Sequence, residues 1–231
     1  MSQPSTPARP SWKRHAKLAV KTVVAVLVLA AVGRHVARTW ADLHARGDSV
    51  RLDPAWAAAG GALYLLGLCA AGLFYARILK NSPSPVAAPA AVRAYLISHL
   101  GKYVPGKAMV VVMRVGLSTP FGARAATAGF ATFYETLVMM AAGSIVATFG
   151  LAVTPGPASQ QAWLLVAAGL AGAFLVVVHP RVFPRISRMV TTPFPGVGPE
   201  AQPAYSYRLL CEGLLLTFVA WTLLGLSQVA V

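Results

Sequence analysis

The chain has 231 residues, of which 57% are hydrophobic and 11% are charged, and its mean hydropathy is +0.63. Soluble domains carry roughly 25% charged residues, so this composition excludes an ordinary soluble globular protein and indicates an integral membrane protein. The formal net charge is +14, but the basic residues cluster beside apolar segments, which favours a membrane surface with anionic lipid over nucleic acid. Alternatively, these cations only orient the spans.

The N-terminal segment is Pro/Ser-rich and then basic, which predicts a cytoplasmic basic tail over residues 1–17. An apolar run follows and predicts a first membrane span over about 18–36. A signal peptide is the competing interpretation, because a basic region precedes the apolar run and small residues end it. Arg34 and His35 follow directly, and they favour an uncleaved span.

Further apolar segments have the length needed to cross a bilayer, which is about 20 residues. They cover about 55–79, 125–153, 161–179 and 209–229. Asp53-Pro54 precedes the first of these segments as a helix start. The predicted fold class is an all-α polytopic membrane protein with about five transmembrane helices and one re-entrant helical hairpin, with the N-terminus inside. Residues 18–231 would form one transmembrane domain.

The hairpin follows from topology. The loop at 77–93 is basic and is therefore expected inside, whereas the turn at 154–160 has no Lys or Arg and is expected outside. The segment 94–117 then begins and ends on the inside. Its halves, 94–104 and 107–117, would each be about 16 Å long at 1.5 Å per residue, too short for a crossing. We therefore expect a re-entrant hairpin.

The stretch Gly101-Lys-Tyr-Val-Pro-Gly-Lys107 matches the start of a phosphate-binding P-loop. Ala108 occupies the position of the magnesium-binding Ser or Thr of that motif. The preceding segment is predicted to be a helix and not a buried strand. These departures exclude a nucleotide triphosphatase.

The same residues suit another anion site. A helix beginning at the Pro-Gly break presents free N–H groups and a partial positive charge. Lys107 lies at that start with Arg114 on the same face, while Tyr95, His99 and Lys102 share a face of the first half. Alternatively, the two lysines only reach to the interface and anchor the hairpin. The candidate substrate-binding residues here are Tyr95, His99, Lys102, Tyr103, Gly106, Lys107 and Arg114.

Glu135 completes this candidate site as the one acidic residue well inside a predicted span. A charge at the bilayer centre costs about 2.5–3.5 kcal/mol on insertion scales, so the side chain should face a partner or a cavity. The candidate partners are Lys102, Lys107 and Arg114. The alternative is a protonated Glu135 that forms a hydrogen bond to a neighbouring helix.

Cys69 and Cys211 both lie in apolar segments and have no companion ligands. They predict neither a disulfide framework nor a zinc site. We expect no metal, no cofactor and no catalytic residues, and no motif indicates an enzyme.

The segment Tyr95–Lys107, the following Arg114 and the glutamate in Phe133-Tyr-Glu-Thr-Leu137 together resemble the lysylphosphatidylglycerol synthase transmembrane region family. The resemblance covers roughly residues 15–231. Members are flippase-like integral membrane proteins, and some carry a soluble domain that transfers an aminoacyl group from tRNA to phosphatidylglycerol. The chain is expected to be C-terminally short relative to the family and to lack that soluble domain, so the synthase activity is not carried over.

The resemblance implies a multi-pass cell-membrane protein that moves lipids between leaflets and handles a phosphate-bearing headgroup. The expected partners are membrane lipids, an anionic or zwitterionic phospholipid, and no nucleic acid, with a homo-oligomer left open. Two other classes remain open at this point. One is a non-transporting or truncated membrane subunit, and the other is a lipid-modifying membrane enzyme using His99 and Glu135 as acid and base.

Overall fold

A computed structural model describes residues 53–103, 108–154, 156–157, 159–191 and 197–230, together with isolated positions between 26 and 45. The predicted tail at 1–17 lies outside the described residues, and so does most of the predicted first span at 18–36. The described residues before 52 are helical and, with Tyr103, form one unit. The second unit comprises 52–102 and 108–231 and contains every helix discussed below.

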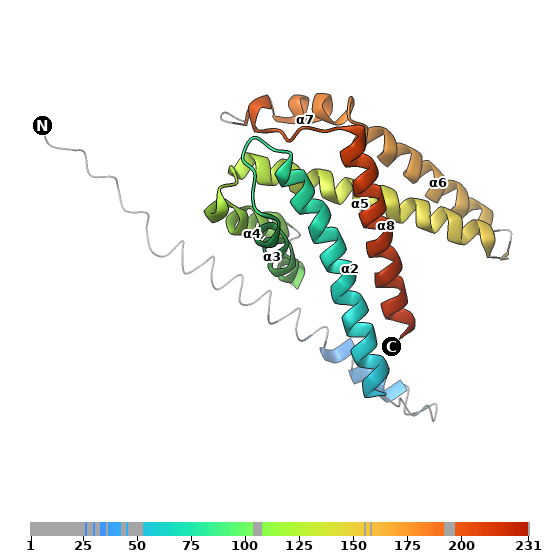
Figure 1. Cartoon of the computed structure of the whole chain (residues 1–231). Coiled ribbons are helices and arrows are strands. Elements are labelled where there is room, and N and C mark those ends of the chain that lie inside the picture. The colour runs from blue at the N-terminus through green and yellow to red at the C-terminus, as the bar shows by residue number, and fades with distance from the viewer. Residues whose placement is uncertain are drawn as a thin grey trace, which may run out of the picture. The chain divides into compact units, whose positions relative to one another are not determined.

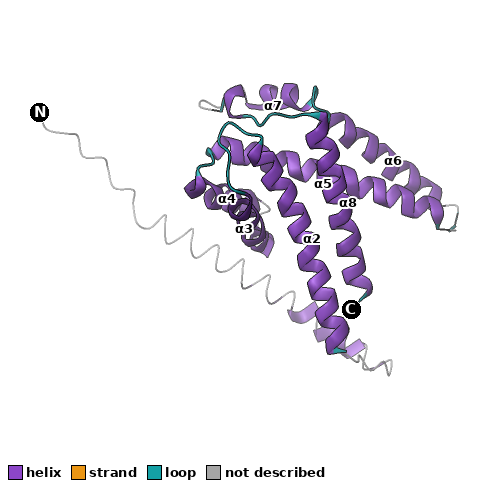
Figure 2. Ribbon diagram, in the orientation of Figure 1, coloured by secondary structure: helices purple, strands orange, loops and turns teal. Residues whose placement is uncertain are grey.

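Within its described residues the chain forms α-helices joined by turns, and no strand occurs among them (Figure 2). In chain order the helices are α2 (Pro54–Lys80), α3 (Ala88–Ser98), α4 (Ala108–Ser118), α5 (Ala125–Val153), α6 (Ser159–Val178), α7 (Phe183–Thr191) and α8 (Tyr207–Val229). Short 3-10 turns lie at His99–Tyr103, Thr119–Phe121 and Pro199–Ala201.

Four of the described helices, α2, α5, α6 and α8, are long and apolar enough to cross a membrane. Their bounds agree with the predicted spans to within two residues at each end. The predicted fold class is therefore confirmed: the chain is an all-α polytopic membrane protein. At 1.5 Å per residue, the 29 residues of α5 extend over about 43 Å, which exceeds the hydrocarbon core of about 30 Å.

Local sequence signals fix where these helices begin and end. The Asp53 carboxylate accepts a hydrogen bond from the Ala55 amide at 2.8 Å, and Pro54 occupies the first helical position of α2, where its missing N–H costs nothing. Ser206 caps α8 in the same way, because its hydroxyl oxygen accepts from the Leu209 amide at 3.1 Å.

The long helices pack as pairs, with α2 lying along α8 and α5 lying along α6 (Figure 1). Small residues let α2 and α8 approach closely. The Phe74 ring of α2 occupies the space that a side chain at Gly213 of α8 would need, as expected for helix packing in membranes. α8 also packs against α5, and the largest buried side chains, which include Phe74 and Tyr134, lie in this interior.

The connection between α6 and α8, which lies outside the predicted spans, contains the additional helix α7. Phe183 at its start is buried and packs edge-on against Tyr134 of α5 and Tyr205, with ring centroids 4.9 Å apart in both cases. α7 has only nine residues, too few for its apolar periodicity to stand out in the sequence. The aromatic contacts join the start of α7 to Tyr134 of α5.

Candidate functional site

The two short helices α3 and α4 form a helical hairpin. Ser98 lies against Arg114, and Gly101 lies against Val110, so the two helices run antiparallel. A Cβ at Gly101 would come within 2.9 Å of the Val110 backbone nitrogen, so the turn needs glycine there. α3 and α4 have 11 residues each, about 16 Å of helix, so neither can cross a hydrocarbon core of about 30 Å.

The hairpin differs from its expected form in where it begins. α3 starts at Ala88, before the expected first residue at 94, so Arg93 lies within the helix and not in the preceding loop. α4 ends at Ser118, one residue beyond the expected end at 117. The expected first arm at 94–104 is therefore displaced: only 94–98 lie in α3, and His99–Tyr103 form a 3-10 turn.

A buried ion pair joins the hairpin to α5. The Arg114 Nη1 atom of α4 lies 2.7 Å from the Glu135 Oε2 atom of α5, and the two side chains are 3% and 4% exposed. The Tyr95 hydroxyl of α3 donates a hydrogen bond to Glu135 Oε1 at 3.1 Å. Both carboxylate oxygens thus have a donor, and the geometry favours an ionised Glu135 paired with Arg114 over a protonated one.

The Arg114 guanidinium has further partners in the hairpin. Its Nε–H donates to the Ser98 hydroxyl at 3.1 Å, and that hydroxyl donates in turn to the Tyr95 carbonyl at 2.8 Å. The guanidinium carbon lies 4.1 Å from the centroid of the Tyr95 ring and 5.1 Å from that of Tyr75, within cation–π range. These contacts fix the orientation in which the Arg114 guanidinium faces Glu135.

The outer shell of the site links α2 to the end of α4. The Tyr75 hydroxyl and the Ser118 hydroxyl are hydrogen-bonded at 3.1 Å, and both residues are fully buried. The Tyr75 ring also contacts that of Tyr95, with centroids 6.2 Å apart. The ion pair is thus enclosed by three elements: the hairpin, α5 and α2.

The remaining predicted residues lie around this centre or away from it. His99 stacks on Tyr95 at 5.8 Å between centroids, and its buried Nδ1 atom has no hydrogen-bond partner among the described residues. Lys102 is exposed and donates to the Tyr64 hydroxyl of α2 at 2.9 Å. Tyr103 is exposed, while Gly106 and Lys107 lie outside the described residues.

The structure thus brings together Tyr95, Arg114 and Glu135, with His99 at their edge. Sequence reasoning missed Ser98, Tyr75, Ser118 and Tyr64. A neutral hydroxyl in an apolar helix is common and gives no distinct signal, because it can bond its own backbone. The spacing of Ser98 three residues after Tyr95 was the one available hint, since such residues share a helix face.

The arrangement at this site is a charge pair: the Glu135 carboxylate accepts from Arg114 and Tyr95, and the Arg114 and Glu135 side chains are almost entirely buried. Among the described residues, no three His, Cys, Asp or Glu side chains gather in a way that could hold a metal ion.

Comparison with known proteins adds no assignment: no family model, no curated protein and no solved structure matches this chain. The class defined by the described residues is therefore a polytopic α-helical membrane protein with a short helical hairpin that packs against α2 and α5.

Proposed function

We propose that this chain is a flippase-like protein of the cell membrane that handles a phosphate-bearing lipid headgroup at the α3–α4 hairpin. The buried Arg114–Glu135 pair carries this proposal. Charged side chains among membrane spans are expensive, and where they occur they mark substrate pathways or switching elements. The resemblance of the hairpin sequence to the lysylphosphatidylglycerol synthase transmembrane region family supports the same flippase-like function, without the synthase activity.

A zwitterionic headgroup matches the pair in charge. Its phosphate is an acceptor for the Arg114 guanidinium, and its amine is a donor for the Glu135 carboxylate. Exchange of the internal pair for these two groups leaves no buried charge uncompensated and so avoids the cost of an unpaired buried charge. Because the pair also joins α4 to α5, exchange would release the hairpin from α5 and provide a two-state element that the lipid biases.

The exposed tip of the hairpin provides the first contact in this scheme. Lys102 lies in the 3-10 turn, and its ammonium group contacts the Tyr64 hydroxyl and lies 5.6 Å from the centroid of the Tyr64 ring. Lys107, five residues further along the chain, adds a second cation. In the proposal these lysines attract the phosphate, and Arg114 receives it.

The proposal requires the hairpin to enter and leave the membrane on one side. In a variant whose native cysteines are replaced, single cysteines at the exposed positions Pro85 and Thr119 flank the two ends of the hairpin. We expect a membrane-impermeant thiol reagent to label both from the same side. Labelling from opposite sides would mean that the segment crosses the membrane and would remove the re-entrant geometry.

The function itself is tested by lipid movement in vesicles. The purified chain is reconstituted into phosphatidylcholine vesicles that contain phosphatidylethanolamine, and an impermeant amine reagent reports how fast inner-leaflet lipid becomes exposed. We expect the wild-type chain to accelerate exposure and Glu135→Gln to return it to the rate of protein-free vesicles. Arg93→Gln is the matched control, because Arg93 is an exposed cation of the same hairpin, and it should keep the wild-type rate.

One observation favours a second candidate, a non-transporting membrane subunit. Arg114 and Glu135 are almost entirely buried, and each has several partners. The pair can therefore act as a purely structural contact that holds α4 against α5. In that case the wild-type chain would move lipid no faster than protein-free vesicles, while Glu135→Gln would still destabilise the fold.

A further inference from the structure

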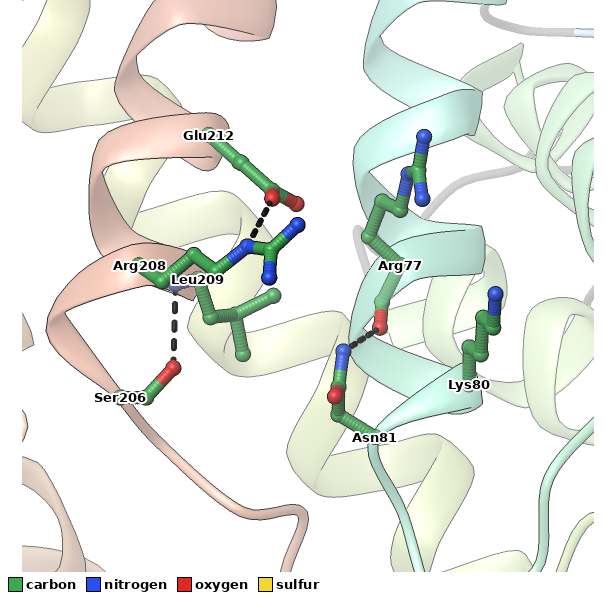
Figure 3. A pocket seen from close by; sticks show the side chains of 7 residues that line it. All are labelled: Arg77, Lys80, Asn81, Ser206, Arg208, Leu209 and Glu212. Atoms are coloured by element: carbon green, nitrogen blue, oxygen red, sulfur yellow. Dashed lines mark hydrogen bonds and ion pairs between the residues drawn. The ribbon is translucent and has the colours of Figure 1, made fainter.

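A polar hollow of about 200 Å³ lies where α2 ends and α8 begins (Figure 3). It is lined by Arg77, Lys80, Asn81, Ser206, Arg208, Leu209 and Glu212. Water occupies about 30 Å³ per molecule in the liquid, so the hollow has room for a group of several heavy atoms such as a phosphate. None of its residues belongs to the hairpin site.

The lining carries an excess of positive charge. Three cations, Arg77, Lys80 and Arg208, face one carboxylate, Glu212. The Arg208 Nε atom lies 2.9 Å from Glu212 Oε1, so one cation is already paired. Among the described residues, the side chains of Arg77 and Lys80 have no ion pair or hydrogen bond. The hollow therefore holds two uncompensated positive charges.

The frame around the hollow is held by local hydrogen bonds. The Asn81 side-chain amide donates to the Arg77 carbonyl at 2.8 Å, and the Asn81 carbonyl accepts from the Ala204 amide at 2.8 Å. The Ser206 hydroxyl already accepts from the Leu209 amide. Recognition therefore rests on the cationic side chains and not on a free amide at the start of α8.

Its position fits a lipid headgroup. Arg77 and Lys80 lie in the last turn of α2, and Arg208 lies in the first turn of α8, so they mark where two spans meet the aqueous boundary. In Figure 3, Arg208 and Glu212 project from α8 toward α2, and Arg77 stands on the facing side. Cations at this level are typical of the cytoplasmic side, where anionic lipid is attracted to them.

We propose that this hollow binds the phosphate of an anionic phospholipid headgroup at the membrane boundary, with Arg77 and Lys80 as its donors. Arg77 provides a planar guanidinium suited to two phosphate oxygens. Glu212 opposes the ligand through its own charge and by occupying Arg208. The proposal is independent of lipid flipping at the hairpin, since the two sites share no side chain.

The test uses the full chain in a neutral detergent, with thermal unfolding followed by tryptophan fluorescence. The melting temperature is measured during titration with short-chain phosphatidylglycerol, with sodium phosphate, and with a phosphate-free glycolipid of equal chain length. We expect saturable stabilisation by phosphatidylglycerol and none by the glycolipid. Equal stabilisation by sodium phosphate would identify free phosphate as the source of the same chemistry, whereas no effect of sodium phosphate would identify the lipid.

Two substitutions with opposite expected effects on binding test whether the lipid binds in this hollow. Arg77→Gln should raise the phosphatidylglycerol concentration at half-saturation about tenfold, because a charge-assisted hydrogen bond is lost. A tenfold change is equivalent to about 1.4 kcal/mol. Glu212→Gln should lower the phosphatidylglycerol concentration at half-saturation, because it removes the opposing charge and frees Arg208. Arg93→Gln is the control and should titrate like the wild type. All three positions are outside the core, so ligand-free melting shows that each variant folds. If Arg77→Gln and Glu212→Gln both gave the same half-saturation concentration as the wild type, the proposal would be overturned.

Discussion

The chain contains two arginine–glutamate pairs of nearly equal length in opposite surroundings. Arg114 and Glu135 are 2.7 Å apart and only 3% and 4% exposed. Arg208 and Glu212 are 2.9 Å apart, but 89% and 34% exposed. The first pair joins two successive helices, α4 and α5, across 21 residues of sequence, whereas the second lies within one turn of α8. Distance alone therefore says little about what each pair does.

Burial decides the energetic role of each pair. An exposed pair four residues apart on a helix contributes about 0.3–0.5 kcal/mol, because water screens the charges. A buried pair brings little net stability over an apolar contact, but removal of one partner leaves a charge in a dry site and costs about 3–5 kcal/mol in soluble proteins. The buried pair therefore makes the position of the hairpin dependent on charge balance, and the exposed pair does not.

The largest effect is expected when the buried pair is broken from one side. Glu135→Gln leaves the Arg114 guanidinium without a counter-charge, although Tyr95 and Ser98 still surround it. By analogy with soluble proteins, we expect a loss of about 3–5 kcal/mol. Thermal unfolding in detergent measures it, with Glu200→Gln on an exposed turn as the control. A melting temperature equal to that of the control would mean that Glu135 is protonated and merely packed.

A smaller effect is expected from the hairpin turn that places Arg114. Gly101→Ala puts a Cβ within 2.9 Å of the Val110 backbone nitrogen, and such overpacking costs about 1–3 kcal/mol. Gly116→Ala is the matched control in the same hairpin, because a Cβ there meets nothing within 4 Å and alanine favours helix. Equal melting temperatures for the two variants would contradict the close approach of the two arms.

The outer shell of the buried pair should contribute less. Tyr75→Phe keeps the ring beside Arg114 but leaves the buried Ser118 hydroxyl without its partner. The cost of such a lost hydrogen bond is about 1 kcal/mol. Ser118→Ala in the Tyr75→Phe background should then recover part of the loss, because no unpaired hydroxyl remains. Chemical unfolding at fixed detergent concentration distinguishes these variants.

The exposed pair gives the smallest expected effect. Arg208→Gln removes an ion pair with a side chain that is 89% exposed, and we expect less than about 0.5 kcal/mol. High salt should reduce even this difference, since it screens exposed charges. A loss as large as that of Glu135→Gln would contradict the role that we assign to burial.

The sequence predicts the membrane spans well and the site only in part. Length and hydropathy define α2, α5, α6 and α8, because an apolar helix that crosses a bilayer needs no tertiary information. Charge asymmetry and arm length predict a hairpin here, but α3 begins at Ala88 and not at 94, and the re-entrant course in the membrane stays a prediction. The partner of Glu135 could not be chosen among three cations, because that choice depends on the register of α4 against α5. Tyr75 and Ser118 gave no signal, since hydroxyl groups in apolar helices have many roles.

The coupling between Arg114 and Glu135 holds the hairpin against α5, and a double-mutant cycle measures it directly. Arg114→Met, Glu135→Gln and the double variant are compared with wild type by thermal unfolding, alongside the same cycle on Arg208 and Glu212. We predict that the double variant recovers part of the single losses, with a coupling energy of about 1–3 kcal/mol for the buried pair and below about 0.5 kcal/mol for the exposed pair. Additive losses at Arg114 and Glu135 would contradict a hairpin held by charge pairing.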